Sequence, residues 1–256
     1  MKLIDTHAHL QFEKFDSDRE GVVKRNSEKL EAIIMPGSRI DNSEAGIKLA
    51  QTVTNLYAAI GVHPHHVDEW EESWLDQLEE LSSQEKVVAV GEIGLDNYQY
   101  KDYPTPVIKS QLKILLPQIE LARKFNKPIL FHCREAYDEL YEAIKSFKPI
   151  SGLVHCFMGT KELSKRFVDL GLLISFAGNL TYKGNDSMRE AANYLPNDLI
   201  VLETDSPYLA PEGFRGERNE PFHVLEVAKT IASVKKVDIE KVAEFTVANS
   251  KKLFGL

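Results

Sequence analysis

Short apolar runs alternate along the chain with longer stretches in which apolar side chains recur every three or four residues. Most of the runs are continuous rather than alternating, which is typical of strands buried on both faces of a parallel sheet. The pattern predicts eight strands, at residues 3–4, 32–35, 56–60, 87–90, 128–131, 152–154, 172–176 and 199–202.

The stretches between these runs carry the spacing of amphipathic helices. Apolar residues at this spacing occur at 74–81, 108–122, 163–170 and 227–234. Pro117 lies within one of them and should kink or interrupt that helix, because proline cannot donate a backbone hydrogen bond.

Eight strand–helix units in 256 residues predict an α/β fold of the (β/α)8 TIM-barrel type. We expect a single barrel domain over residues 1–256, since no linker or low-complexity segment divides the chain. A doubly wound sheet is the alternative, but no glycine-rich phosphate turn follows the first strand.

Six potential metal ligands lie at the carboxyl ends of predicted strands. They are His7 and His9 at the first strand, Glu92 at the fourth, His132 at the fifth, His155 at the sixth and Asp205 at the eighth. Each alone has an ordinary explanation, such as a polar cap or a first-turn acid of the next helix. Together they indicate a common site, because the catalytic residues of a barrel gather at this end.

Four imidazoles and two carboxylates are too many for one tetrahedral ion and suffice for two. We place His7, His9 and Asp205 on the first ion and His132 and His155 on the second, with Glu92 between the two. Two ions about 3.5–4 Å apart would clamp the attacking and leaving oxygens of a displacement and activate a water molecule. Asp205 could also accept that water's proton.

The motifs around these ligands resemble the TatD family of metal-dependent deoxyribonucleases, among the amidohydrolase-like barrels. The resemblance rests on residues 5–10 (DTHAHL), 61–65 (GVHPH), 91–96 (GEIGLD), 128–134 (PILFHCR), 154–157 (VHCF), 203–209 (ETDSPYL) and 215–221 (RGERNEP). It implies hydrolysis of phosphodiester bonds in DNA, often from a 3′ end, with divalent metals and the same six ligands. Met158 departs from the pattern, where a small residue such as serine is commoner.

Several further polar residues are candidates for contact with substrate, and each has a structural alternative. His63 is expected near the substrate phosphate or the nucleophile, whereas His65 and His66 are expected in a solvated turn. Arg134 could bind phosphate or form a salt bridge with Glu135 or with an acid of a neighbouring loop.

Two long segments without helical or strand pattern, residues 93–105 and 206–221, follow the fourth and eighth predicted strands. The second carries Arg215 and Arg218, which could bind phosphate bidentately or hold the loop to the barrel rim. The first carries three tyrosines, which could stack on bases but more often pack a loop down. These are Tyr98, Tyr100 and Tyr103.

Three side chains beside the proposed ligands have other expected roles. Glu203 is expected to orient a metal-binding histidine. Cys133 and Cys156 each follow a ligand histidine, so on a strand their side chains should point away from the metals as small buried hydrophobes.

Composition and net charge narrow the class of protein. The formal net charge of −8 argues against a protein that coats nucleic acid, but not against an enzyme with a local cationic site. The two cysteines, the absence of a long apolar run and the acid near the N-terminus suggest a cytoplasmic protein without a membrane partner. No obligate protein partner is inferred.

The leading hypothesis is a two-metal 3′–5′ exonuclease that acts on single-stranded or frayed DNA ends. The alternative is a binuclear esterase or amidase, such as a D-aminoacyl-tRNA deacylase, because the same centre accepts different electrophiles. A non-catalytic metal-binding scaffold is a third hypothesis. Magnesium or manganese is expected for activity, while zinc or nickel could accompany the purified protein.

Overall fold

The computed structural model describes residues 2–101 and 104–256. Its eight strands form one parallel sheet in which each strand pairs with its neighbour in sequence, in the order β1 to β8. The strands are β1 (Ile4–Asp5), β2 (Ala32–Pro36), β3 (Leu56–Ile60), β4 (Val87–Asp96), β5 (Ile129–Arg134), β6 (Gly152–Val154), β7 (Leu173–Phe176) and β8 (Ile200–Leu202).

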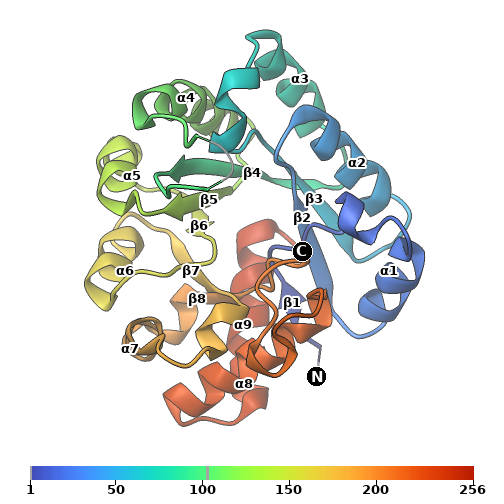
Figure 1. The fold of residues 1–256 in the computed structure, drawn as a ribbon, viewed down its shortest axis with the longest axis vertical. Coiled ribbons are helices and arrows are strands. Elements are labelled where there is room, and N and C mark those ends of the chain that lie inside the picture. Colours follow the sequence, from blue (N-terminus) through green and yellow to red (C-terminus); the bar gives the residue numbers. More distant parts are fainter. Residues whose placement is uncertain (1, 102–103) are drawn as a thin grey trace.

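Helices follow the strands and surround the sheet (Figure 1). They are α1 (Arg19–Ser27), α2 (Ile40–Ala50), α3 (Ser73–Ser82), α4 (Ile108–Lys124), α5 (Tyr137–Ile144), α6 (Lys161–Val168), α7 (Asp186–Tyr194), α8 (Val224–Lys235) and α9 (Ile239–Phe254). The TIM barrel predicted from the alternation of apolar runs is thereby confirmed. No helix in the described part of the chain is long and apolar enough to cross a membrane.

Backbone hydrogen bonds just after the short strand β1 connect the first strand to the last, so that the barrel is almost closed. The amide of Thr6 donates to the carbonyl of Leu202 at 3.0 Å, and the amide of Asp205 donates to the carbonyl of His7 at 2.9 Å. The amide of His9 donates to the carbonyl of Ser206 at 2.7 Å. Two proposed ligand segments therefore form the seam between the first and last strands.

The predicted boundaries hold for most strands and fail for β4. This strand runs to Asp96 rather than ending at residue 90, so it includes part of the segment expected to be a loop. Its far end pairs with β5, with Gly94 opposite His132 and Asp96 opposite Arg134. A Cβ atom on Gly94 would lie 1.9 Å from the carbonyl oxygen of His132, so only glycine permits this approach.

Helix α4 also differs from the prediction, because it continues through Pro117. Pro117 lies near the middle of the helix with only part of its surface buried, while Gln118 and Ile119 beside it are buried. The apolar face of the helix therefore packs across the position where the proline was expected to interrupt it.

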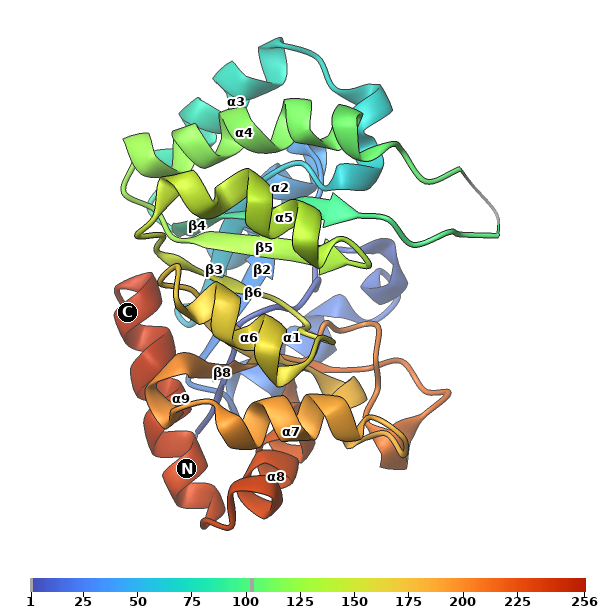
Figure 2. The same ribbon diagram turned by 90° about the vertical axis from the view of Figure 1, so that its left-hand side faces the viewer.

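The hydrophobic core has two parts. The larger lies between the sheet and the helices, and the smaller fills the barrel with side chains such as Ile34, Leu130 and Val201. Phe254, near the end of α9, belongs to this interior cluster. Figure 2 shows the C-terminal end of α9 on the left, opposite the loops that follow the carboxyl ends of β4 and β5 on the right. Helix α9 thus closes the amino-terminal end of the barrel and leaves the carboxyl end open.

We expect Phe254→Ala to lower the free energy of unfolding by about 3 kcal/mol, because it opens a cavity against the barrel interior. Chemical denaturation measures the change. Leu116→Ala, which removes a side chain that is 39% exposed, is the control and should alter stability by less than about 0.5 kcal/mol. Equal effects of the two substitutions would contradict the closing role of α9.

Candidate metal centre

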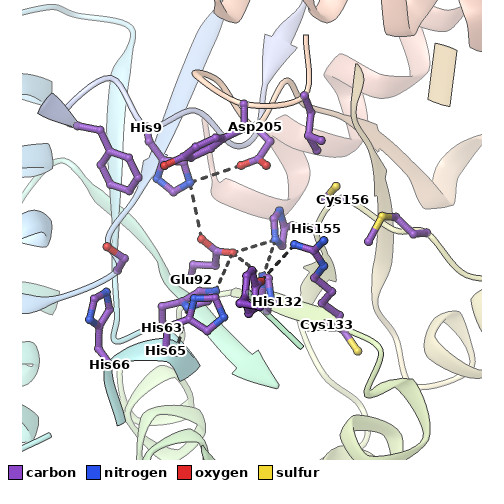
Figure 3. A pocket seen from close by; sticks show the side chains of 17 residues that line it. His9, His63, His65, His66, Glu92, His132, Cys133, His155, Cys156 and Asp205 are labelled. Atoms are coloured by element: carbon purple, nitrogen blue, oxygen red, sulfur yellow. Dashed lines mark hydrogen bonds and ion pairs between the residues drawn. The ribbon is translucent and has the colours of Figure 1, made fainter. Parts of the chain in front are cut away.

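The six predicted ligands come together at the carboxyl end of the barrel, as Figure 3 shows for five of them. Their ligand atoms form overlapping groups that could hold metal ions. Two of these groups are His7, His9 and Asp205, and His7, Glu92 and His155, while His132 joins Glu92 in a third that also includes His63. The convergence predicted from separate strand ends is confirmed.

The first group consists of donor atoms at similar separations. The Nε2 atoms of His7 and His9 lie 3.1 Å apart and lie 3.7 and 3.5 Å from Oδ1 of Asp205. The same two nitrogens lie 3.4 and 3.7 Å from Oε2 of Glu92. Ligand atoms around a tetrahedral ion with bonds of about 2.0–2.1 Å would be roughly 3.4 Å apart, so these residues fit a divalent metal.

The second group uses the other oxygen of the same carboxylate. Oε1 of Glu92 lies 2.8 Å from Nδ1 of His132 and 2.9 Å from Nε2 of His155. The two imidazole nitrogens are 3.1 Å apart. Glu92 therefore directs one oxygen to each group, which is the arrangement a bridging carboxylate needs.

Local geometry of β4 aims the Glu92 side chain. The pairing of β4 with β5 shifts its register between Gly91 and Ile93, so Glu92 is an extra residue without a partner. Such bulges redirect a side chain and are common next to active sites. Glu92 lies in the barrel mouth with only 7% of its side chain exposed.

Two further carboxylates set the orientation of the second pair of histidines. Oε1 of Glu203 lies 3.2 Å from Nδ1 of His155, so a neutral ring that donates from Nδ1 would present its Nε2 lone pair to a metal. Oδ2 of Asp96 lies 3.1 Å from Nε2 of His132, which leaves the Nδ1 lone pair for a metal. Glu203 therefore makes the contact that its predicted orienting role requires, since such partners orient metal-binding histidines.

Asp96 is the residue of this kind that sequence reasoning missed. It is completely buried, and it also accepts hydrogen bonds from the Tyr100 hydroxyl at 2.7 Å and contacts Nε2 of His65 at 2.8 Å. The available signal was the spacing of Glu92 and Asp96, because residues four apart on one strand point to the same side. The expected loop boundary at residue 93 concealed it.

His63 has a different orientation from the proposed ligands. Its Nδ1 accepts a hydrogen bond from the backbone amide of His65 at 3.1 Å, so the neutral ring carries its proton on Nε2. That atom lies 3.6 Å from Oε1 of Glu92. Burial and the neighbouring His132 hold the pKa of His63 well below its usual value. A neutral ring with an Nε2 proton suits hydrogen bonding to an anionic substrate better than metal binding.

The centre balances buried charges of both signs. Burial by itself would raise the pKa of Glu92, but the surrounding imidazoles, His155 foremost, hold this pKa well below its usual range. Burial would likewise lower the pKa of His155, but Glu92 and Glu203 hold it well above its usual value. His132 also has a raised pKa, because Asp96 and Glu92 outweigh the effect of burial.

The predicted arginine contacts divide into two kinds. Arg134 lines the cavity above the centre, and its guanidinium stacks on Tyr98 at 3.8 Å rather than pairing with Glu135. Arg218 forms two hydrogen bonds with Asp18, at 2.8 and 2.7 Å. Arg215 lies over the Tyr182 ring at 4.6 Å. Neither Arg215 nor Arg218 borders the cavity, and the contacts of Arg218 match its structural alternative.

Two of the three tyrosines after the fourth predicted strand, Tyr98 and Tyr100, pack the loop, as the commoner alternative predicted. Tyr98 supports Arg134, and Tyr100 donates to Asp96. Tyr103 lies outside the described residues. His66 pairs with Glu69 at 2.8 Å in a partly exposed turn, as expected. The expectation of a solvated turn was wrong for His65, because its ring contacts the buried Asp96.

Both cysteines are buried, and neither belongs to a candidate metal group among the described residues. Figure 3 shows their sulfur atoms pointing away from the histidines. Burial raises the pKa of both thiols well above the usual value, so neither is a ready ligand or nucleophile.

The cavity above the six residues has a volume of about 530 Å³. Its wall includes apolar side chains to which the sequence analysis gave no role at the site, namely Phe12, Met158, Tyr208 and Leu209. Met158 and Tyr208 are each 42% exposed. The cavity therefore combines a polar floor with an open apolar rim.

A family model described as TatD related DNase matches residues 4–255. The chain belongs to this family. A Bacillus subtilis relative named an uncharacterized metal-dependent hydrolase, YabD, is 37% identical, and the match covers 99% of each chain. The Shigella flexneri 3′-5′ ssDNA/RNA exonuclease TatD is 30% identical, also over 99% of each chain. The crystal structure of the Escherichia coli TatD homologue YjjV superimposes with a TM-score of 0.92 at 32% identity, covering 99% of this chain and 98% of that one.

In this TatD-family chain, Asp96→Asn should weaken divalent metal binding about 10- to 100-fold, because the uncharged amide no longer raises the basicity of His132. Competition with a fluorescent chelator measures the affinity. Asp138→Asn, which changes an acid whose side chain is 78% exposed, is the matched control and should leave the affinity unchanged. Unchanged affinity in Asp96→Asn would contradict the orienting role.

Metal binding by this TatD-family chain should release protons and weaken as the pH falls below neutral. The neighbouring carboxylates raise the pKa of His132 and His155, which favours the protonated rings, and each ring must give up a proton to bind a metal. Calorimetric titration with Mn²⁺ in buffers of different ionisation enthalpy measures the proton release. An observed binding heat that is the same in every buffer would rule out proton release.

Proposed function

We propose that the chain hydrolyses phosphodiester bonds of DNA with two divalent metal ions, as a 3′–5′ exonuclease on single-stranded or frayed ends. The proposal rests on the position of the Glu92 carboxylate, whose two oxygens face separate groups of ligand atoms. The relative named a 3′-5′ ssDNA/RNA exonuclease supports the substrate class and the polarity.

The proposed ligands are those predicted from the sequence. His7, His9 and Asp205 would hold the first ion, His132 and His155 the second, and Glu92 would bridge them. When bound, two such ions supply a nucleophilic water at neutral pH and neutralise charge on the phosphate.

Asp205 is the proposed proton acceptor. Its side chain is 16% exposed, against 0% for His7 and 4% for His9, so it faces the cavity most openly in its group. Burial would raise the pKa of Asp205, but the hydrogen bond with His9 and the charge of His7 hold it below its usual value. The carboxylate is therefore ionised and ready to take a proton.

His63 and Arg134 are the proposed phosphate contacts. His63 offers an Nε2 proton at the floor of the cavity, and Arg134 offers a cation whose plane is held against Tyr98. Both line the cavity. Contacts of Arg215 and Arg218 with more distant phosphates remain predictions. Arg218 would have to break its hydrogen bonds with Asp18 to reach a phosphate.

The mixture of imidazoles and carboxylates does not select one metal. Carboxylates and water suit magnesium and manganese, which we propose as the activating ions, while imidazoles favour zinc or nickel, which could be retained on purification.

The net charge of −8 predicts weak non-specific DNA binding and an affinity concentrated at the metal centre. We propose a cytoplasmic protein that needs no obligate protein partner.

End-labelled single-stranded DNA and Mn²⁺-loaded protein test the proposal. Cleavage from the 3′ end that EDTA abolishes is expected, and Asp205→Asn should lower kcat by about 10²- to 10⁴-fold through loss of the proton acceptor. Asp198→Asn, at an exposed position in the turn before β8, is the control and should keep full activity.

The same preparation should be offered a D-aminoacyl-tRNA. Faster hydrolysis of this ester than of DNA by orders of magnitude would replace the nuclease proposal with the alternative. Absence of metal-dependent cleavage of either substrate would refute both.

A further inference from the structure

The cavity rim beside the first ligand group is aromatic. The ring of Phe12 stacks on the ring of His9 with centroids 4.3 Å apart and planes inclined by 17°. Tyr208 stands edge-on to Phe12, with centroids 6.5 Å apart. The two rings thus form a wall that begins at a proposed metal ligand and extends to the mouth.

Tyr208 is exposed although its backbone is held in place. Its amide donates to the carbonyl of Asp205 at 2.8 Å, and its carbonyl accepts from Nδ2 of the buried Asn219 at 2.6 Å. Asn219 bonds Thr204 through the same nitrogen at 2.9 Å. The ring is therefore presented at a set place relative to the centre, yet 42% of the residue remains accessible.

This exposure is unusual for the molecule. Among the described residues, the large apolar side chains with high exposure are Val107, Leu116, Met158, Tyr194 and Tyr208. Met158 and Tyr208 line the cavity above the metal centre. Lys14 places its ammonium 4.2 Å from the centroid of the Tyr208 ring, which adds a positive charge at the same rim.

We propose that Phe12 and Tyr208 form a subsite for the nucleobase of the nucleotide whose phosphate lies at the metal centre. The inference rests on the proposed function, because it assumes a nucleotide substrate. A planar base can stack on an aromatic ring whatever its sequence identity, and such a contact adds about 5- to 100-fold in affinity.

Nucleotide binding measured without turnover isolates this subsite. Thymidine 5′-monophosphate and 2-deoxyribose 5-phosphate share the phosphate and sugar and differ by the base. Calorimetry on the Mn²⁺-loaded protein should show that the nucleotide binds about 5- to 100-fold more tightly than the sugar phosphate. Equal affinities would overturn the proposal even without any variant.

Substitutions then test whether the preference for the nucleotide over the sugar phosphate depends on the aromatic wall. Tyr208→Ala and Tyr208→Leu should reduce the ratio of the two affinities towards one, whereas Tyr208→Phe should keep it because the ring remains. Tyr194→Ala is the matched control, since Tyr194 is 49% exposed but lies on α7 away from the cavity. A full preference retained in both Tyr208→Ala and Tyr208→Leu would overturn the assignment.

The outcome separates the subsite from the nuclease proposal. A protein that prefers the nucleotide but does not cleave DNA would retain the subsite and lose the proposed function. A protein that cleaves DNA but binds both ligands equally would retain the function and lose the subsite.

Discussion

The buried carboxylate of Glu92 is the interaction on which the centre depends. Its two oxygens lie within 2.8–3.7 Å of imidazole nitrogens from three strand ends, and burial leaves these groups little water to separate their charges. A buried anion requires cationic partners, and crowded imidazoles require an anion. The proposed metal site and the packing of these strand ends therefore depend on the same buried contacts.

The barrel satisfies this constraint with backbone that also stabilises the fold. His7, His9 and Asp205 belong to the seam where the first and last strands meet, and their amides and carbonyls make the hydrogen bonds that draw the barrel together. Glu92 projects from a bulge in β4, while His132 is fixed by its contact with Asp96 on the neighbouring strand. Helix α9 fills the opposite end with Phe254, which leaves the ligand end as the open one.

The mouth is chemically asymmetric. The side near β4 and β5 carries Arg134 supported by Tyr98, whereas the side near β1 and β8 carries Phe12 and Tyr208. A phosphate and a flat apolar group attached to it need such different neighbours, because one requires cations and hydrogen-bond donors and the other requires apolar surface. The acidic character of the whole chain does not oppose this, because Arg134 supplies a cation at the cavity itself.

The barrel, the six proposed ligands and their division around Glu92 could all be predicted from the sequence, because burial on both faces leaves continuous apolar runs and the polar residue that ends each run stands out. The extent of β4 and the contacts of Asp96 and His65 with the centre became visible only in the folded chain. The tertiary structure also decided that Arg218 turns to Asp18 while Tyr208 faces the cavity. These features depend on strand register and on loop contacts between distant residues, which no local pattern encodes.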